Sequence, residues 1–80
     1  MKEMKQYINL SDVARLLIFH TYRMNERGEK VNKSILEKRF GKEIVNEGLK
    51  EIFSQTKPLL LEKNKNYIVC EEIRRYYRLL

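Results

Sequence analysis

The chain has few of the residues that build disulfides, metal centres and membrane spans. Among its 80 residues one is cysteine and one is histidine, which excludes an internal disulfide and a zinc site built mainly from these ligands. The longest apolar run, Leu16–Phe19, has four residues, whereas a transmembrane helix needs about 18 and a signal peptide about 7–15. We therefore expect a soluble, cytoplasmic protein without a membrane partner, a bound metal or another cofactor.

Glycine and proline are also scarce, with three residues and one residue, so no flexible linker is visible. A chain of this length forms one domain with a modest core, burying roughly 60% of the surface that its unfolded form exposes. Hydrophobic residues make up 42% of the chain and charged residues 35%. This balance is too apolar for a disordered chain and too charged for a membrane protein.

Patterns typical of enzymes are absent from the sequence. It holds no legible Ser–His–acid set, no pair of acids spaced for catalysis and no glycine-rich phosphate loop. His20 falls in an apolar segment and Cys70 follows another, so we expect both side chains to pack in or beside the core. The sequence therefore predicts a binding protein rather than an enzyme.

Three helices are expected in the first two thirds of the chain. Ser11 can cap a helix over residues 12–26, whose apolar side chains cover more than one stripe and place it at the centre of the domain. Residues 29–31 form a brief strand in this interpretation. Asn32 can cap a second helix over residues 33–39, which Gly41 separates from a third over residues 42–55.

A hairpin and a fourth helix follow. Pro58 ends the helix before it, and the runs Leu59–Glu62 and Tyr67–Cys70 are typical of two strands joined by a polar, asparagine-rich turn. The last helix is expected over residues 73–80, with acids before it and arginines within it, as the helix dipole favours.

From residue 12 to residue 69, this order of elements resembles the winged helix-turn-helix superfamily. The stretches that carry the resemblance most specifically are Val31-Asn32-Lys33-Ser34-Ile35-Leu36-Glu37-Lys38-Arg39-Phe40-Gly41 and residues 43–52, with residues 60–69 as the wing. The resemblance implies a small α+β fold with a three-helix core, a hairpin wing and an extra C-terminal helix. Residues 1–10 would be an arm or short helix, residues 11–70 the winged-helix domain and residues 71–80 the added helix. A three-helix domain with an unrelated hairpin stays open as the alternative.

The resemblance also implies a function, which is duplex DNA binding by a small transcriptional regulator. Winged helices usually place their third helix in the major groove and their wing on phosphate or in the minor groove. The second helix is expected to lie across the DNA backbone. The candidate contact residues on the second helix, on the third helix and on or before the wing are Lys33, Ser34, Lys42, Glu43, Asn46, Glu47, Lys50, Lys57, Lys63, Asn64 and Lys65.

The charge distribution fits backbone contact better than base reading. The net charge of +6 divides into +2 over residues 1–27, +1 over residues 28–56 and +3 over residues 57–80, so the surplus lies outside the helix-turn-helix. The outer side of the third helix carries Glu43 and Glu47 beside Asn46 and Lys50. Because carboxylates near phosphate are unfavourable, a winged-helix adaptor that binds protein is the alternative function.

The last helix is a candidate dimerisation element. Its apolar side consists of Ile73, Tyr76, Tyr77 and Leu80. A helix this short is marginal alone, so this side must dock either on the helix over residues 12–26 or on a second copy. We expect a homodimer through these residues, with a monomer as the alternative, since a dimer matches two DNA half-sites.

Overall fold

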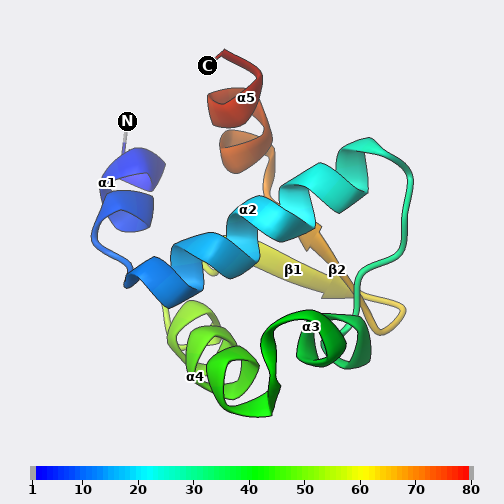
Figure 1. The fold of residues 1–80 in the computed structure, drawn as a ribbon. Coiled ribbons are helices and arrows are strands. Elements are labelled where there is room, and N and C mark those ends of the chain that lie inside the picture. The colour runs from blue at the N-terminus through cyan, green and yellow to red at the C-terminus, as the bar shows by residue number, and fades with distance from the viewer. Residues whose placement is uncertain (1, 80) are drawn as a thin grey trace.

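The computed structural model describes residues 2–79 of the chain, with side chains from residue 5 onward. The described residues form a small α+β fold of five helices and one two-stranded antiparallel sheet, which confirms the α+β part of the expected fold class (Figure 1). The elements in chain order are α1 (Lys2–Ile8), α2 (Asp12–Glu26), α3 (Lys33–Phe40), α4 (Lys42–Phe53), β1 (Leu60–Lys63), β2 (Asn66–Val69) and α5 (Glu71–Leu79). This layout is compatible with a winged helix.

Helix α2 lies at the centre of the fold, as its apolar pattern predicts. Its N-cap is Ser11, whose hydroxyl accepts a hydrogen bond from the Ala14 N–H at 3.2 Å. One side of α2 packs on α4 and β2, and its buried residues are Ala14, Leu17, Ile18, Thr21 and Met24. The hydroxyl of Thr21 donates to the Leu17 carbonyl at 2.8 Å, so this buried polar group is satisfied.

Helices α2 and α4 approach closely at Gly48. A Cβ atom added to this glycine would lie 2.3 Å from Cδ1 of Leu17, so only a glycine fits without rearrangement. The buried side of α4 consists of Val45, Gly48, Leu49 and Ile52. Helical spacing in the sequence predicts that Ile44 and Phe53 belong to this side as well, but they are 40% and 39% exposed because they lie at the two margins of the contact.

The hairpin is paired in one register, with Leu60 opposite Val69 and Lys63 opposite Asn66. Its loop is the residue pair Asn64–Lys65, with φ angles of 53° and 66°, as a type I′ turn requires. Both strands lie one residue closer to the turn than expected. The reason is that Lys63 and Asn66 pair beside the two-residue loop, while Leu59 and Cys70 keep only a hydrogen bond beyond the strand ends.

The prediction of a brief strand at residues 29–31 is wrong. Val31 makes a single backbone bond to the sheet, accepting from the Tyr67 N–H at 2.8 Å. The side chain of Asn25 in α2 continues this edge: its Nδ2 donates to the Tyr67 carbonyl at 3.2 Å and its Oδ1 accepts from the Val69 N–H at 3.0 Å. One asparagine thus satisfies backbone groups of β2 that a third strand would otherwise pair.

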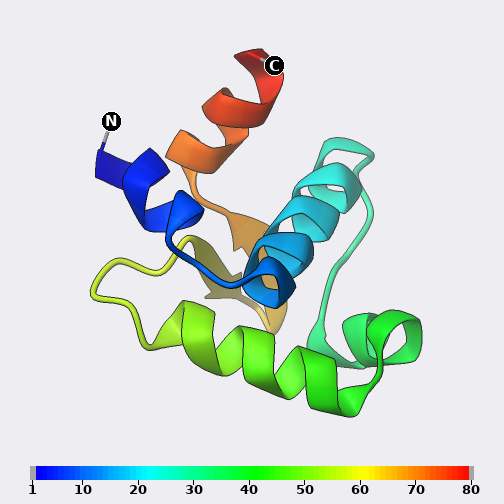
Figure 2. The same ribbon diagram turned by 60° about the vertical axis from the view of Figure 1, so that its left-hand side comes forward.

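Helices α1 and α5 lie side by side at one end of the molecule (Figure 2). Tyr7 and Tyr77 share a hydrogen bond through their hydroxyls, and the Tyr77 ring stacks on Tyr22 of α2 with centroids 4.8 Å apart. Helix α5 begins at Glu71, the first residue of the segment expected to form the added helix, and α4 ends two residues earlier than expected, at Phe53. Among the described residues no helix combines the length and the apolar character that crossing a membrane requires.

Candidate nucleic-acid interface

An open groove separates α4 from the hairpin. Its volume is about 350 Å³, and it is lined by Lys33, Asn46, Leu49, Lys50, Phe53, Glu62 and Tyr67. These residues come from α3, α4, β1 and β2, so the groove exists only in the folded chain. It brings together three residues that the resemblance assigns to DNA binding, namely Lys33, Asn46 and Lys50.

The groove side of α4 is set by the opposite, buried side of the helix. Because Val45, Gly48 and Ile52 face the core, Asn46 and Lys50 one turn apart point outward, and both are exposed. Phe53 continues this side toward the hairpin, where its ring lies 5.8 Å from that of Tyr67. The remaining site residues of α4, Lys42, Glu43 and Glu47, are also exposed but do not line the groove.

Lys33 and Ser34 occupy the first turn of α3. Asn32 fixes this turn, since its side-chain Oδ1 accepts from the Ile35 N–H at 2.9 Å. Lys33 reaches the groove, whereas Ser34 is exposed on the same turn and does not line it. Helix α3 therefore offers one cation toward α4 and a hydroxyl beside it.

The lysines that the sequence assigns to a wing lie at the tip of the hairpin. Lys63, Asn64 and Lys65 are all exposed, and the type I′ turn holds the last two in a fixed backbone conformation. Lys57 does not belong to this cluster. It lies in the loop between α4 and β1, where its carbonyl accepts from Gln6 Nε2 at 2.5 Å and its side chain lines a separate depression.

The ion pairs of the described residues separate arginine from lysine. All four such pairs are made by arginine: Arg15–Asp12, Arg27–Glu29, Arg74–Glu71 and Arg78–Glu26. Among side chains from residue 5 onward, no lysine forms an ion pair, and the lysines of α3, α4 and the hairpin tip are exposed. These ammonium groups are available for an external anion.

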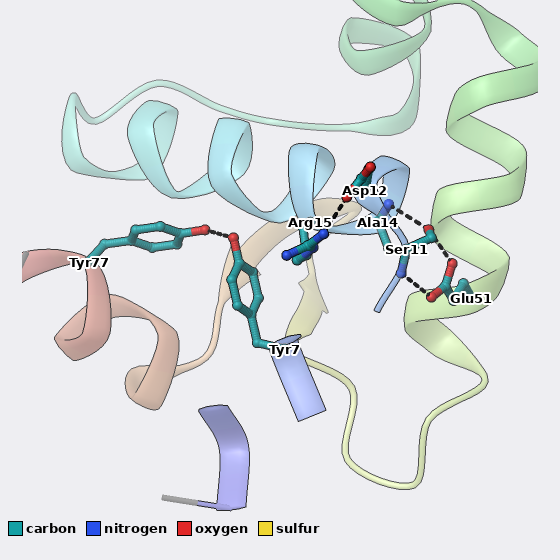
Figure 3. A network of polar contacts seen from close by, with 7 residues as sticks. All are labelled: Tyr7, Ser11, Asp12, Ala14, Arg15, Glu51 and Tyr77. Carbon is teal, nitrogen blue, oxygen red and sulfur yellow. Dashed lines mark hydrogen bonds and ion pairs between the residues drawn. The ribbon is translucent and has the colours of Figure 1, made fainter. Parts of the chain in front are cut away.

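One acid of α4 has a structural role that removes it from the exposed side. The Glu51 carboxylate accepts from the Ser11 N–H at 2.7 Å and from the Ser11 hydroxyl at 2.5 Å (Figure 3). In a capping box a glutamate at the third helical position makes the first of these bonds. Here Ala14 occupies that position, and Glu51 from another helix takes its place.

The sequence pattern does not point to three of the residues that line the groove. It places Phe53 with the core, and it gives Glu62 and Tyr67 no role beyond that of ordinary strand residues. Burial raises the pKa of Tyr67, and the negative charge of the Glu62 carboxylate raises it further. The hydroxyl therefore stays protonated at neutral pH. The alternation of side chains along the hairpin could have placed Glu62 and Tyr67 on one face, since they pair directly in the sheet.

The expected dimer residues are in contact with their own chain. Ile73 is completely buried, and Tyr77 packs on Tyr7, Phe19 and Tyr22. Tyr76 is half-buried, with its ring 5.8 Å from that of Tyr7. Leu80 lies outside the described residues. Of the two docking partners that the sequence left open for this side, the structure shows the intramolecular one.

His20 and Cys70 pack beside the core as expected. The His20 ring contacts the Phe40 ring edge-on, with centroids 5.1 Å apart. Burial lowers the pKa of His20, and the positive charges of Arg39 and Arg27 lower it further. Burial raises the pKa of the half-buried Cys70 thiol. Within the described residues no cluster of three or more histidine, cysteine or acidic side chains could hold a metal ion.

Comparison with known proteins gives no match to a family model, to a curated protein or to a solved structure.

Proposed function

We propose that this chain is a winged helix-turn-helix domain that binds duplex DNA without catalysis, as a small transcriptional regulator. The observation that carries the proposal is the groove between α4 and the hairpin, into which Lys33, Asn46 and Lys50 converge from two helices. None of the lysines beside it is neutralised by an ion pair among the described residues. A polyanion is the partner that such a surface fits.

Helix α4 would read the major groove with its exposed side. Asn46 carries the amide that can donate to and accept from the edge of adenine, and Lys50 can reach guanine or a phosphate. Helix α3 would lie across the backbone, with Lys33 and Ser34 on phosphate. The groove would then admit the sugar-phosphate chain that runs between α4 and the wing.

The wing would contact the backbone without reading sequence. Lys63 and Lys65 lie at a tight turn with no acid paired to them among the described residues. A turn of this kind presents charge but no extended surface for base edges. Lys57 has no place in this mechanism, because it lies before the hairpin at a separate depression that residues of α1 and α5 also line.

A protein-binding adaptor is the second candidate. Glu43 and Glu47 are exposed one turn apart on α4, and Ile44 between them is 40% exposed. An acidic stripe with an exposed isoleucine is better suited to a basic, partly apolar protein surface than to phosphate. In this function the groove lysines would form the rim of a protein interface.

Salt titration of binding to duplex DNA separates the two candidates. If the chain neutralises about 4–6 phosphates, the logarithm of affinity should fall with the logarithm of salt concentration at a slope of about −4 to −5. The absence of DNA binding at about 50 mM salt would contradict the proposal and favour the adaptor. The proposed role is consistent with the expected cytoplasmic location and with a homodimer on two half-sites.

A further inference from the structure

Helix α2 carries an exposed stripe that the proposed DNA contact does not use. The stripe consists of Asp12, Leu16, Phe19 and Arg23, spaced four, three and four residues apart, which puts all four on one side of the helix. Leu16 is 44% exposed and Phe19 is 38% exposed. Figure 1 shows α2 crossing the front of the molecule with no other element in front of it.

The neighbouring helices reach only the margins of this stripe. On one side Tyr77 of α5 touches Phe19, with ring centroids 5.1 Å apart. On the other side His20, which is not part of the stripe, contacts Phe40 of α3. The Arg23 guanidinium lies 5.8 Å from the centre of the Phe19 ring, so cation and ring are held together on the surface.

The order of charges along the stripe makes it complementary to itself. An acid stands at the N-terminal end, a cation at the C-terminal end, and two apolar residues lie between them. When two copies of α2 are placed antiparallel about a two-fold axis midway between Leu16 and Phe19, each Asp12 faces the other copy's Arg23. The four apolar side chains of the two copies then meet at the centre.

We propose that this stripe is the dimerisation surface of the chain, and that its partner is a second copy bound antiparallel through α2. A parallel arrangement would place Asp12 against Asp12 and Arg23 against Arg23, which opposes it. Asp12 is available for the contact, since its side chain is 94% exposed and its pairing with Arg15 lies within the same turn. The apolar side of α5 is already covered by α1 and α2 and is not needed.

This dimer is compatible with the proposed function but does not depend on it. The stripe and the groove are separate surfaces, because the groove is lined by α3, α4 and the hairpin and includes no residue of α2. Two helices of 15 residues bury less than the roughly 1,600 Å² of a standard protein interface. We therefore expect a dimer that dissociates at micromolar concentrations and that concentration-dependent sedimentation detects.

A charge-swap experiment tests the antiparallel register. Asp12→Arg puts cations at both ends of the stripe, and Arg23→Asp puts acids at both ends. The homodimer of each variant should be weakened by repulsion between like charges, which raises its dissociation constant about tenfold or more. An equimolar mixture of the two should form heterodimers, since the two cations of one chain then face the two acids of the other. Analytical ultracentrifugation measures all three samples, with circular dichroism to show that each variant is folded.

A matched pair of apolar variants tests the centre of the interface. Leu16→Glu should abolish the dimer, whereas Ile8→Glu, at an exposed isoleucine of α1, should leave it intact. A wild-type chain that remains monomeric at millimolar concentration would overturn the proposal. So would a dimer that survives Leu16→Glu, or charge-reversed variants that fail to associate when mixed. Because none of these measurements includes DNA, their failure leaves the proposed DNA binding to be judged separately.

Discussion

Asn25 and Val69 form the bond that closes the outer edge of the hairpin. Oδ1 of Asn25 accepts from the Val69 N–H at 3.0 Å, while Nδ2 of the same side chain donates to the Tyr67 carbonyl. A helix side chain thereby anchors the hairpin directly to the central helix. The position of the hairpin relative to α4, and so the shape of the groove, depends on this residue.

Asn25→Ala should destabilise the fold by about 1–3 kcal/mol, because it leaves buried backbone groups of β2 without partners. Asn25→Asp keeps the acceptor for Val69 but turns a carboxylate oxygen toward the Tyr67 carbonyl, so it should also destabilise the fold, and less so at low pH, where the carboxyl is protonated and can donate. Urea denaturation measures both variants, and hydrogen exchange of the Val69 amide reports the bond itself. Unchanged exchange of that amide in Asn25→Ala would show that the edge is held by other contacts.

Gly48→Ala should destabilise the chain despite the higher helix propensity of alanine, which by itself favours the substitution by about 1 kcal/mol. The added Cβ would meet Leu17 at 2.3 Å, and overpacking of this kind typically costs about 1–3 kcal/mol. Leu17→Ala in the same chain removes the clashing atom. The two substitutions together should therefore lose less stability than their separate effects predict. Thermal melts of the three variants provide the test, and additive losses would contradict the close approach.

How much of this fold the sequence predicts depends on the range of the interactions. The starts of α2 and α3 are predictable, because Ser11 and Asn32 cap them through bonds to residues three positions away. The roles of Asn25 and Glu51 are not, since each acts on a segment more than 35 residues distant, at separations of 44 and 40 positions. No periodicity distinguishes such residues from any other polar residue of the sequence.

The same limit explains the mixed result for the candidate site. Helical phase correctly places Asn46 and Lys50 outward, because Val45 and Ile52 fix the buried side. Phase does not give the width of the contact between α2 and α4, so it cannot predict that Phe53 is exposed. Glu62 joins the groove only through the packing of the hairpin beside α4. The assignment of Lys33 to this site required the resemblance to a known family rather than a residue pattern.

His20 should make stability depend on pH below neutrality. Burial lowers its pKa from 6.5, and the positive charges of Arg39 and Arg27 lower it further. The unfolded chain therefore binds a proton more readily than the folded one. The contribution of neutral His20 to stability is therefore fully present above pH 6.5. It is lost as the pH falls toward the lowered pKa of the folded state. His20→Gln removes this contribution. Denaturation at about pH 7.5 and about pH 5.5 should show a smaller difference between the two conditions for the variant than for the wild type.

The proposed roles of the wing and of α4 predict different effects on DNA binding. Replacing Lys63 and Lys65 with alanine should weaken binding to every duplex by a similar factor. It should also reduce the salt slope by about 1 for each phosphate that is no longer neutralised. The control for a general loss of charge is replacement of Lys38, which is exposed on α3 and lies neither in the groove nor at the hairpin tip.

Asn46→Ala and Lys50→Ala should instead reduce the preference for one sequence over another. If these side chains read base edges, each substitution should cost about 1–3 kcal/mol on a preferred duplex and little on random DNA. Glu43 and Glu47 lie on the same helix and would repel phosphate, so changing both to glutamine should strengthen non-specific binding if α4 faces DNA. If that side of α4 meets a protein, the double glutamine variant should bind DNA as the wild type does. Competition between preferred and random duplexes measures all of these effects. If only the variant without Lys63 and Lys65 binds DNA more weakly, the hairpin is the DNA contact and α4 does not contact DNA.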